Sequence, residues 1–379
     1  MSASSVDAGA LTLRRATPAD GAAMCELFAR VPMETELALS IRRDPDFSAL
    51  LRLQSADWEC WVAEEEGRVE AMASLVFRDG YLGGEPRRVG YLGDLRLSPA
   101  VQGRHLLNRV YGPTLAASAA ARGCVASLTA VIASNERALR ALTAQNRRQR
   151  GMPRYTPLRD FRIRNVHLTV PRFPERSAFR VRRAAEADLP ALAAFLDADA
   201  RRRPFGQPMP EAELRRRLAE WPGLSIDSFY LAEDGAGALV GCLAVWDAAP
   251  VKRTVVSAYR GKMRRIKTGY DIAARLLRFP RLPDPGEELR YLYATHQSVP
   301  SDDPAVLRAL LRRVYADHRR GGHVLLSFFV PEDDPMESAF RGFQFTDLPA
   351  RLFVVTPPGV QPPPECLAPG RPGFEMALV

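Results

Sequence analysis

An internal repeat is the feature of this 379-residue chain that most constrains its fold. Residues 13–20 read LRRATPAD, and 168 residues later residues 181–188 read VRRAAEAD. Each copy predicts a short strand, a turn with an aspartate, and an amphipathic helix, at 22–31 and 189–197. Because a chain of this length exceeds what one hydrophobic core usually fills, the repeat predicts two related units in tandem.

A second match lies at a similar distance along the chain. Residues 62–64 read VAE and residues 231–233 read LAE, 169 residues later. A glycine turn and a second apolar stretch follow each copy, at 69–77 and at 239–246. Two apolar stretches joined by a short glycine turn predict a β-hairpin in each unit.

A third match is displaced further and reveals an insertion. Residues 106–111 read LLNRVY, and residues 310–315 read LLRRVY, 204 residues later. Both copies begin a predicted helix that ends at glycine, and an apolar strand follows each one, at 125–132 and 324–330. The larger offset places the insertion in the second unit, at about 248–287.

This order of strands and helices predicts an α/β fold with a mixed sheet flanked by helices in each unit. Prolines resist both helices and central strands, so the proline-containing segment after residue 170 is the natural linker. The expected organisation is an N-terminal domain 1–170, a linker 171–178, a C-terminal domain 179–356 and a Pro-rich tail 357–379.

A longer motif in the first unit carries a family resemblance. Residues 94–104 read DLRLSPAVQGR and resemble the fourth strand and pyrophosphate loop of the GNAT superfamily, the acyl-CoA-dependent N-acyltransferases. Residues 13–20 resemble the first strand and helix start of that family. The resemblance implies two tandem GNAT-like domains, with acetyl-CoA or another acyl-CoA bound by the first. Main-chain amides at a helix N-terminus would hold the pyrophosphate.

The resemblance also implies a set of cofactor-binding residues. They are Leu95, Leu97, Gln102, Gly103, Arg104, His105, Leu106, Leu107 and Asn135. His105 and Leu107 stand where the family has small residues, so they either leave the backbone donors free or block the site. The alternative for His105 is a structural role at the start of the helix. The alternative for Asn135 is a helix cap in place of a cofactor contact.

Asp94 is the candidate catalytic residue, because a carboxylate on the strand that enters the loop can deprotonate an amine. Its alternative role is to fix a turn or to pair with an arginine. The tyrosine acid usual in the family would fall near Leu142, where there is none. Tyr155, in the following strand region, is a substitute for it or a core residue.

The second unit keeps the repeat but lacks the loop. Residues 299–304 read VPSDDP where phosphates would bind, and two aspartates repel a pyrophosphate. This half is therefore a degenerate copy. His296 aligns with Asp94 and is expected in the core or in a cleft between the halves. The basic insertion is either an electropositive lid or docking surface or a solvated excursion.

Composition limits which partners, metals and cellular locations the sequence allows. The formal net charge of +9 comes almost entirely from arginine, and no nucleic-acid reader motif accompanies it, so no nucleic-acid partner is expected. The five cysteines are scattered and never form C-x-x-C, so no metal site is expected. With neither a secretory signal pattern nor a long apolar run, we expect a cytoplasmic protein without a transmembrane segment.

The sequence therefore predicts an N-acyltransferase that moves an acyl group, most simply acetyl, from acyl-CoA to an amine. The acceptor is expected to be a small-molecule amine or a peptide. The alternative is a catalytically inactive tandem protein that binds a ligand or a partner in the cleft between its halves. The altered loop, the missing tyrosine and the acidic second loop favour this alternative.

Overall fold

The computed structural model describes residues 6–7, 11–30, 37–102, 110–143, 151–168, 177–277, 281–319 and 321–379. Two segments that the sequence singles out, 103–107 of the predicted loop and 171–174 of the linker, lie outside these ranges.

The first half contains eight strands and four α-helices within the described ranges. Its strands are β1 (Val6–Asp7), β2 (Thr12–Arg15), β3 (Leu37–Arg42), β4 (Asp57–Glu65), β5 (Arg68–Leu82), β6 (Glu85–Leu97), β7 (Ala126–Ile132) and β8 (Arg154–His167). Its helices are α1 (Gly21–Arg30), α2 (Ala49–Gln54), α3 (Gly112–Ala120) and α4 (Glu136–Thr143).

The second half repeats much of this order. Its strands are β9 (Arg180–Arg183), β10 (Phe229–Glu233), β11 (Leu239–Trp246), β12 (Arg253–Tyr259), β13 (Tyr291–Ser298), β14 (Leu325–Pro331) and β15 (Phe345–Thr356). Its helices are α5 (Leu189–Arg201), α6 (Glu211–Glu220), α7 (Gly261–Leu277) and α8 (Pro304–His318). Gly123 and Gly322, just beyond α3 and α8, have φ of +59° and +84°, a conformation that glycine adopts without steric cost.

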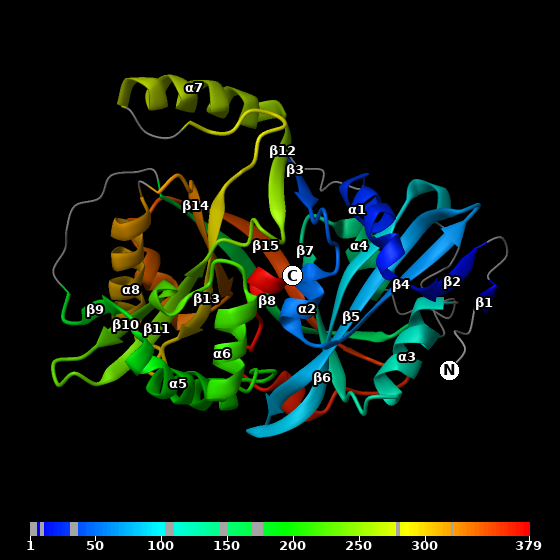
Figure 1. Cartoon of the computed structure of the whole chain (residues 1–379), viewed down its shortest axis with the longest axis horizontal. Coiled ribbons are helices and arrows are strands. Elements are labelled where there is room, and N and C mark those ends of the chain that lie inside the picture. The colour runs from blue at the N-terminus through cyan, green and yellow to red at the C-terminus, as the bar shows by residue number, and fades with distance from the viewer. Residues whose placement is uncertain are drawn as a thin grey trace.

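The two halves share one 13-stranded mixed sheet with helices on both faces (Figure 1). Its order is β1-β2-β4-β5-β6-β7-β15-β8-β14-β13-β11-β10-β9. The fold class and the tandem architecture expected from the repeat are therefore confirmed.

Each half contributes a strand to the other half's part of the sheet. The late strand β15 pairs with β7 of the first half, along Ala350–Val355 and Ser127–Ile132. The early strand β8 pairs with β14 of the second half, and β8 and β15 also pair with each other. The centre of the molecule is thus built from strands that cross between the halves.

The repeated sequence motif forms the same ion-pair network twice. Arg14 on β2 lies 2.7 Å from a carboxylate oxygen of Asp20 and 2.7 Å from one of Glu64. The Arg14 guanidinium holds the pKa of Asp20 well below its ordinary value. The second half repeats the network, at 2.6 Å for each pair, with Arg182, Asp188 and Glu233. The motif is conserved between the halves for a structural reason: it ties the first strand to the hairpin and to the helix start.

The helices pack on the sheet through several hydrophobic clusters. The largest cluster joins α2 of the first half to α5 and α6 of the second, and it includes the chain's last segment, residues 376–378. Helix α8 packs on the opposite face of the second half, over Leu243 and Val245 of β11. Because the largest cluster draws residues from both halves, the core is continuous across them.

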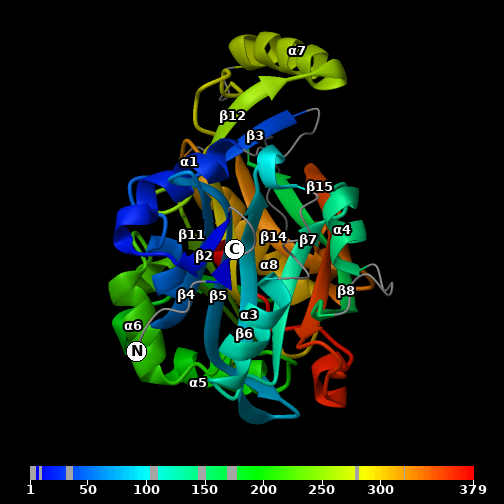
Figure 2. The same ribbon diagram turned by 90° about the vertical axis from the view of Figure 1, so that its right-hand side faces the viewer.

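The insertion of the second half forms an arm. Strand β12 pairs antiparallel with β3 of the first half in a separate two-stranded sheet. Helix α7 follows and stands away from the main body in both views (Figures 1 and 2). Its side chains Ile266, Ile272 and Leu276 are 54%, 58% and 76% exposed. These three apolar side chains therefore lie largely in solvent.

Candidate functional site

The site predicted on β6 lies where this strand separates from β7. The two strands pair in parallel only along Val89–Tyr91 and Ala126–Leu128. Beyond Tyr91 the strands β6 and β7 have no ladder pairing, although Thr129 Oγ1 still donates to the carbonyl of Leu92 at 2.8 Å. The backbone of β6 from residue 92 onward is therefore left with one side free of a ladder partner, at the strand that leads into the predicted loop.

A β-bulge interrupts β6 at the same place. Its register with β5 shifts between Met72 and Ser74, and Asp94 adopts a φ of +54°. This left-handed conformation is uncommon outside glycine and costs on the order of 1 kcal/mol. Surrounding contacts must hold it, and the Asp94 side chain supplies them.

Asp94 is engaged in a buried ion pair. Arg43 reaches it with two nitrogens, at 2.9 Å to Oδ2 and 2.8 Å to Oδ1, and Ser74 Oγ donates to Oδ2 at 2.7 Å. The two charged side chains are 3% and 7% exposed. The Arg43 guanidinium also lies 5.0 Å from the ring centroids of both Phe28 and Phe47. This is the arginine pairing that was the alternative role for Asp94.

The second half has the same bulge with different chemistry. Strand β13 pairs with β14 only along Tyr291–Tyr293, its register with β11 shifts between Cys242 and Ala244, and His296 has a φ of +49°. The alignment of His296 with Asp94, made on sequence alone, thus corresponds to equivalent bulge positions.

The His296 ring is buried in a chain of hydrogen bonds. Arg217 Nη1 donates to its Nε2 at 2.9 Å, and its Nδ1 lies 3.1 Å from Thr295 Oγ1, which donates to Glu375 Oε2 at 2.6 Å. Burial, reinforced by the Arg217 charge, holds the His296 pKa well below 6.5. The imidazole is therefore neutral, with its proton on Nδ1.

The other predicted cofactor residues occupy different surroundings. Leu95 and Leu97 line an apolar pocket. Gln102 Nε2 donates to the carbonyl of Leu97 at 3.1 Å, which fastens the start of the loop to β6. Asn135 Oδ1 accepts from the amide of Ala138 at 3.1 Å, the helix-cap contact that was its alternative role. The remaining predicted residues, Gly103, Arg104, His105, Leu106 and Leu107, lie outside the described ranges.

The apolar pocket has a volume of about 60 Å³ and lies between α3 and strands β2, β4, β5 and β6. Three small residues, Ala63, Ala71 and Ala73, form part of its floor, where larger side chains would fill the space. Trp61 and Tyr111 complete its wall. The pocket can accept an apolar group of a few carbon atoms beside the unpaired part of β6.

Tyr111 was missed by the sequence reasoning, although it belongs to the third repeat match. Its hydroxyl lies 3.1 Å from that of Tyr155, the candidate substitute for the family's acid. Burial raises the pKa of Tyr111 to about 12 and that of Tyr155 well above 10. Both phenols are therefore protonated at neutral pH, and Tyr111 is the one that lines the pocket.

Lys252 lies between the two bulges and the last residues of the chain. Its Nζ donates to the carbonyl of Ala377 at 3.1 Å and to that of Val379, and it lies 4.6 Å from the ring centroid of Tyr293. Burial, followed by repulsion from Arg43, lowers its pKa to about 7. The lysine fastens the terminal segment, and no sequence signal distinguished it from the other lysines of the insertion.

Comparison with known proteins agrees with this geometry. Residues 23–145 match the sequence model of the acetyltransferase (GNAT) family. No curated protein matches the chain by sequence. Among the described residues, no helix is both long and apolar enough to cross a bilayer.

Several solved structures have a similar fold over most of the chain. N-myristoyltransferase of Saccharomyces cerevisiae with bound myristoyl-CoA is 10% identical, with a TM-score of 0.57 over 95% of this chain and 83% of that one. A GCN5-related N-acetyltransferase of Sphaerobacter thermophilus is 15% identical, with a TM-score of 0.56 over 97% and 98%. A tandem GNAT protein from the clavulanic acid biosynthesis pathway is 12% identical, with a TM-score of 0.55 over 93% and 99%.

Residues 23–145 are therefore similar in sequence to the GNAT acetyltransferase family, and the whole chain has the tandem GNAT fold. Acyl-CoA is the cofactor typical of that family.

Proposed function

We propose that the protein is an N-acyltransferase that moves an acyl group, most simply acetyl, from acyl-CoA to an amine. The observation that carries the proposal is the separation of β6 from β7 after Tyr91, within the domain that matches the GNAT family. Unpaired main-chain groups of β6 would pair with the amides of the pantetheine arm. The apolar pocket beside Leu95 and Leu97 would hold the acyl group.

The remaining cofactor contacts follow from the sequence motif and stay predictions. Gln102 and residues 103–107 would surround the pyrophosphate at the start of the following helix, and Asn135 would contact the cofactor arm. The apolar pocket has a volume of only about 60 Å³, which favours a short acyl chain over a long one.

In the reaction, the amine nitrogen attacks the thioester carbonyl carbon. The C–N bond forms, the C–S bond breaks, and the proton that the amine loses goes to a base while the CoA thiolate takes up a proton. No covalent enzyme intermediate is needed, so positioning and amine deprotonation supply most of the rate. Asp94 is the proposed base. The neighbouring Ser74 and Arg43 would fix its orientation.

A non-catalytic tandem binding protein is the second candidate. It is favoured by two contacts: Asp94 is engaged by Arg43, and Asn135 caps its own helix. Both proposed functional side chains thus already have structural partners.

Thermal unfolding with acetyl-CoA and a thiol-release assay over a panel of amines separate the candidates. An enzyme is stabilised by the cofactor and releases CoA faster with one class of amine than without it. A binding protein is stabilised without amine-dependent release. Absence of stabilisation at millimolar acetyl-CoA would contradict the proposed acyltransferase.

A further inference from the structure

A second pocket lies at the bulge of the second half, away from the apolar pocket of the first. Its volume is about 110 Å³, and residues 294–298 of β13, next to the separation of β13 from β14, form one wall. Helices α5 and α6 and the terminal segment 371–376 form the others. One residue, Arg78, comes from β5 of the first half. Both halves therefore contribute residues to this pocket.

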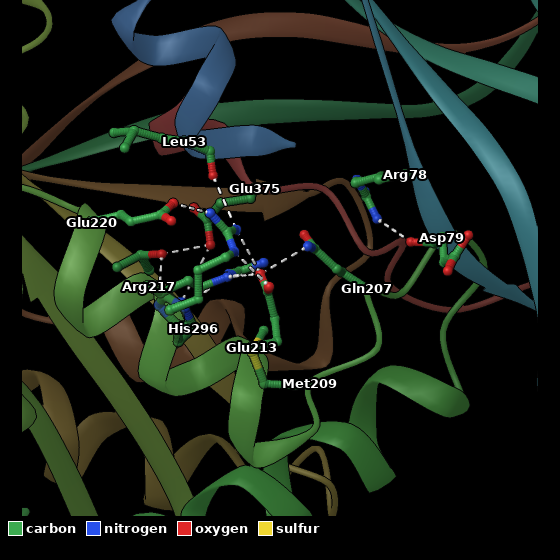
Figure 3. Close-up of polar contacts among 12 residues, drawn as sticks. Leu53, Arg78, Asp79, Gln207, Met209, Glu213, Arg217, Glu220, His296 and Glu375 are labelled. Atoms are coloured by element: carbon green, nitrogen blue, oxygen red, sulfur yellow. Dashed lines mark hydrogen bonds and ion pairs between the residues drawn. The ribbon is translucent and has the colours of Figure 1, made fainter. Parts of the chain in front are cut away.

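Arginine dominates the charge of this pocket. Its lining contains the four arginines Arg78, Arg203, Arg217 and Arg371, against the two acids Asp199 and Glu375. Two of the arginines are neutralised locally. Arg203 pairs with Asp199, and Arg217 Nε donates to Glu213 at 2.9 Å beside the neutral His296 (Figure 3).

The other two arginines lack a close carboxylate among the described residues. Arg78 donates only to main-chain oxygens, at 3.1 Å to Asp79 and at 3.4 Å to Phe205 and Gly373. Arg371 donates to the Gln297 amide oxygen and the Phe329 carbonyl, both at 3.1 Å, and its closest carboxylate oxygen, on Asp334, is 4.0 Å away. Two positive charges in one pocket thus have only neutral hydrogen-bond partners in contact.

Burial disfavours the charged form of both guanidinium groups. Burial, together with repulsion from Arg217, lowers the pKa of Arg78 to about 10. Burial and repulsion from Arg203 lower the pKa of Arg371 to about 10 as well. A bound anion would give Arg78 and Arg371 charge-assisted hydrogen bonds, which are stronger than neutral ones.

The position of Arg78 connects this pocket to Asp94. Ser74 and Arg78 are four residues apart on β5, so their side chains share the face of the strand that carries Asp94. Strand geometry places their Cα atoms about 13 Å apart. Arg78 and the Asp94 contact thus lie on the same face of β5, with the buried Val76 between them.

We propose that the arginine pocket, defined by Arg78, Arg217 and Arg371, binds the carboxylate group of the amine acceptor. The inference rests on the proposed function and adds the acceptor's chemical class: a small molecule with a carboxylate as well as the reacting amine. A planar guanidinium fork matches a carboxylate. The pocket volume suits such a group with a few attached atoms, and Asp199 and Glu375 disfavour a dianionic phosphate.

The test is binding of succinate, followed by tryptophan fluorescence at constant ionic strength. Trp221 reports on the pocket, because its ring lies 5.2 Å from the Arg217 guanidinium and 5.3 Å from the His296 ring. Arg78→Gln and Arg371→Gln each remove one fork, and Arg87→Gln, at an exposed position of β6, is the matched control. Loss of one charge-assisted contact weakens binding about 10-fold or more in the first two variants, and the control keeps the wild-type affinity.

Arg78→Gln removes a charge with no carboxylate partner in contact, so the variant is expected to fold, and its unfolding temperature without ligand verifies this. Unchanged succinate affinity in both pocket variants would overturn the proposal, as would binding of inorganic phosphate with no binding of succinate. Acetyl-CoA binding is measured on the same samples. If the wild-type protein binds succinate but not acetyl-CoA, the proposed function is contradicted. If it binds acetyl-CoA but not succinate, only the carboxylate site is contradicted.

Discussion

At the scale of single residues, the two halves place different ionisable side chains at equivalent backbone positions. Asp94 and His296 both sit at a bulge with positive φ, on the strand that separates from its parallel neighbour. Asp94 is charged and paired with Arg43, whereas His296 is neutral and accepts from Arg217. The two copies therefore differ at the position closest to the proposed chemistry.

The role of Asp94 can be measured by Asp94→Asn, with Asp188→Asn as control. Both substitutions remove one carboxylate from an arginine pair, but Asp188 belongs to the structural network on β9. If Asp94 is the base, its variant loses about 100-fold or more in kcat and still binds acetyl-CoA, because general base catalysis typically contributes this much. The control should keep its kcat. Equal kcat values in the two variants and the wild type would make Asp94 purely structural.

His296 predicts an acid-sensitive stability. The folded state keeps this imidazole neutral, while the unfolded chain takes up a proton below its ordinary pKa of 6.5. The unfolded state then binds more protons, so stability falls as the pH falls below about 6.5. Protonation would also set a ring N–H against the Arg217 donor.

The measurement is the free energy of unfolding in urea at pH 7.5 and pH 5.0, for wild type and His296→Gln. Between pH 6.5 and pH 5.0 the histidine accounts for about 2 kcal/mol, from 1.36 kcal/mol per pKa unit. The wild type should lose about this much more stability than the variant. The same pH dependence in both proteins would show that another group is responsible.

At the scale of elements, strand β5 contributes to both pockets, whereas helix α7 contributes to neither. Strand β5 supplies the apolar pocket from one face, through Ala73 and Leu75, and the Asp94 contact and Arg78 from the other. Helix α7, by contrast, stands on the arm away from the main body (Figure 2). Its exposed apolar side chains contribute little to the fold.

Replacing the three exposed side chains of α7, Ile266, Ile272 and Leu276, with serine should change the free energy of unfolding by less than about 1 kcal/mol in total. Leu310→Ala in α8 is the comparison, because Leu310 is fully buried and such a substitution costs about 2–5 kcal/mol. Urea unfolding of both proteins checks the contrast. A large loss in the α7 variant would mean that this helix packs on the body in solution.

Local elements were predictable from the sequence, and long-range pairing was not. The repeat predicted the strand, turn and helix at the start of each half, because apolar periodicity and helix-start residues are local signals. The pairing of β15 with β7 joins residues more than two hundred positions apart, and no local pattern encodes it. The β3–β12 pairing escaped prediction for the same reason.

The site was predictable only in part. The 94–104 motif indicated the strand that carries Asp94 but not its bulge, and the repeat alignment indicated His296. Arg78 and Arg371 gave no signal, because arginine is abundant throughout this chain and only the fold shows which ones have no carboxylate within hydrogen-bond distance among the described residues. Tyr111 was hidden in a repeat match that looked purely structural.

At the scale of the whole molecule, strand exchange ties the two halves into one unit. The sheet is continuous from β1 to β9, and its centre alternates strands of the two halves. Separating the halves would break the β7–β15 and β8–β14 pairings and expose the largest hydrophobic cluster. Neither half is therefore expected to be stable alone.

A single cooperative unfolding transition follows from this arrangement. The four tryptophans allow a direct check, since Trp58 and Trp61 lie in the first half and Trp221 and Trp246 in the second. Replacing either pair with phenylalanine leaves reporters in one half only. The two variants should each show fluorescence and far-ultraviolet circular dichroism transitions that coincide. Two separated transitions within one variant would contradict the shared core.

A crystal structure after soaking with acetyl-CoA shows whether the first half binds acyl-CoA along β6. We expect pantetheine beside the backbone of residues 92–97, with the acetyl group near the apolar pocket and the bulge at Asp94. Cofactor bound only in the second half, or absent from both halves at millimolar concentration, would contradict it.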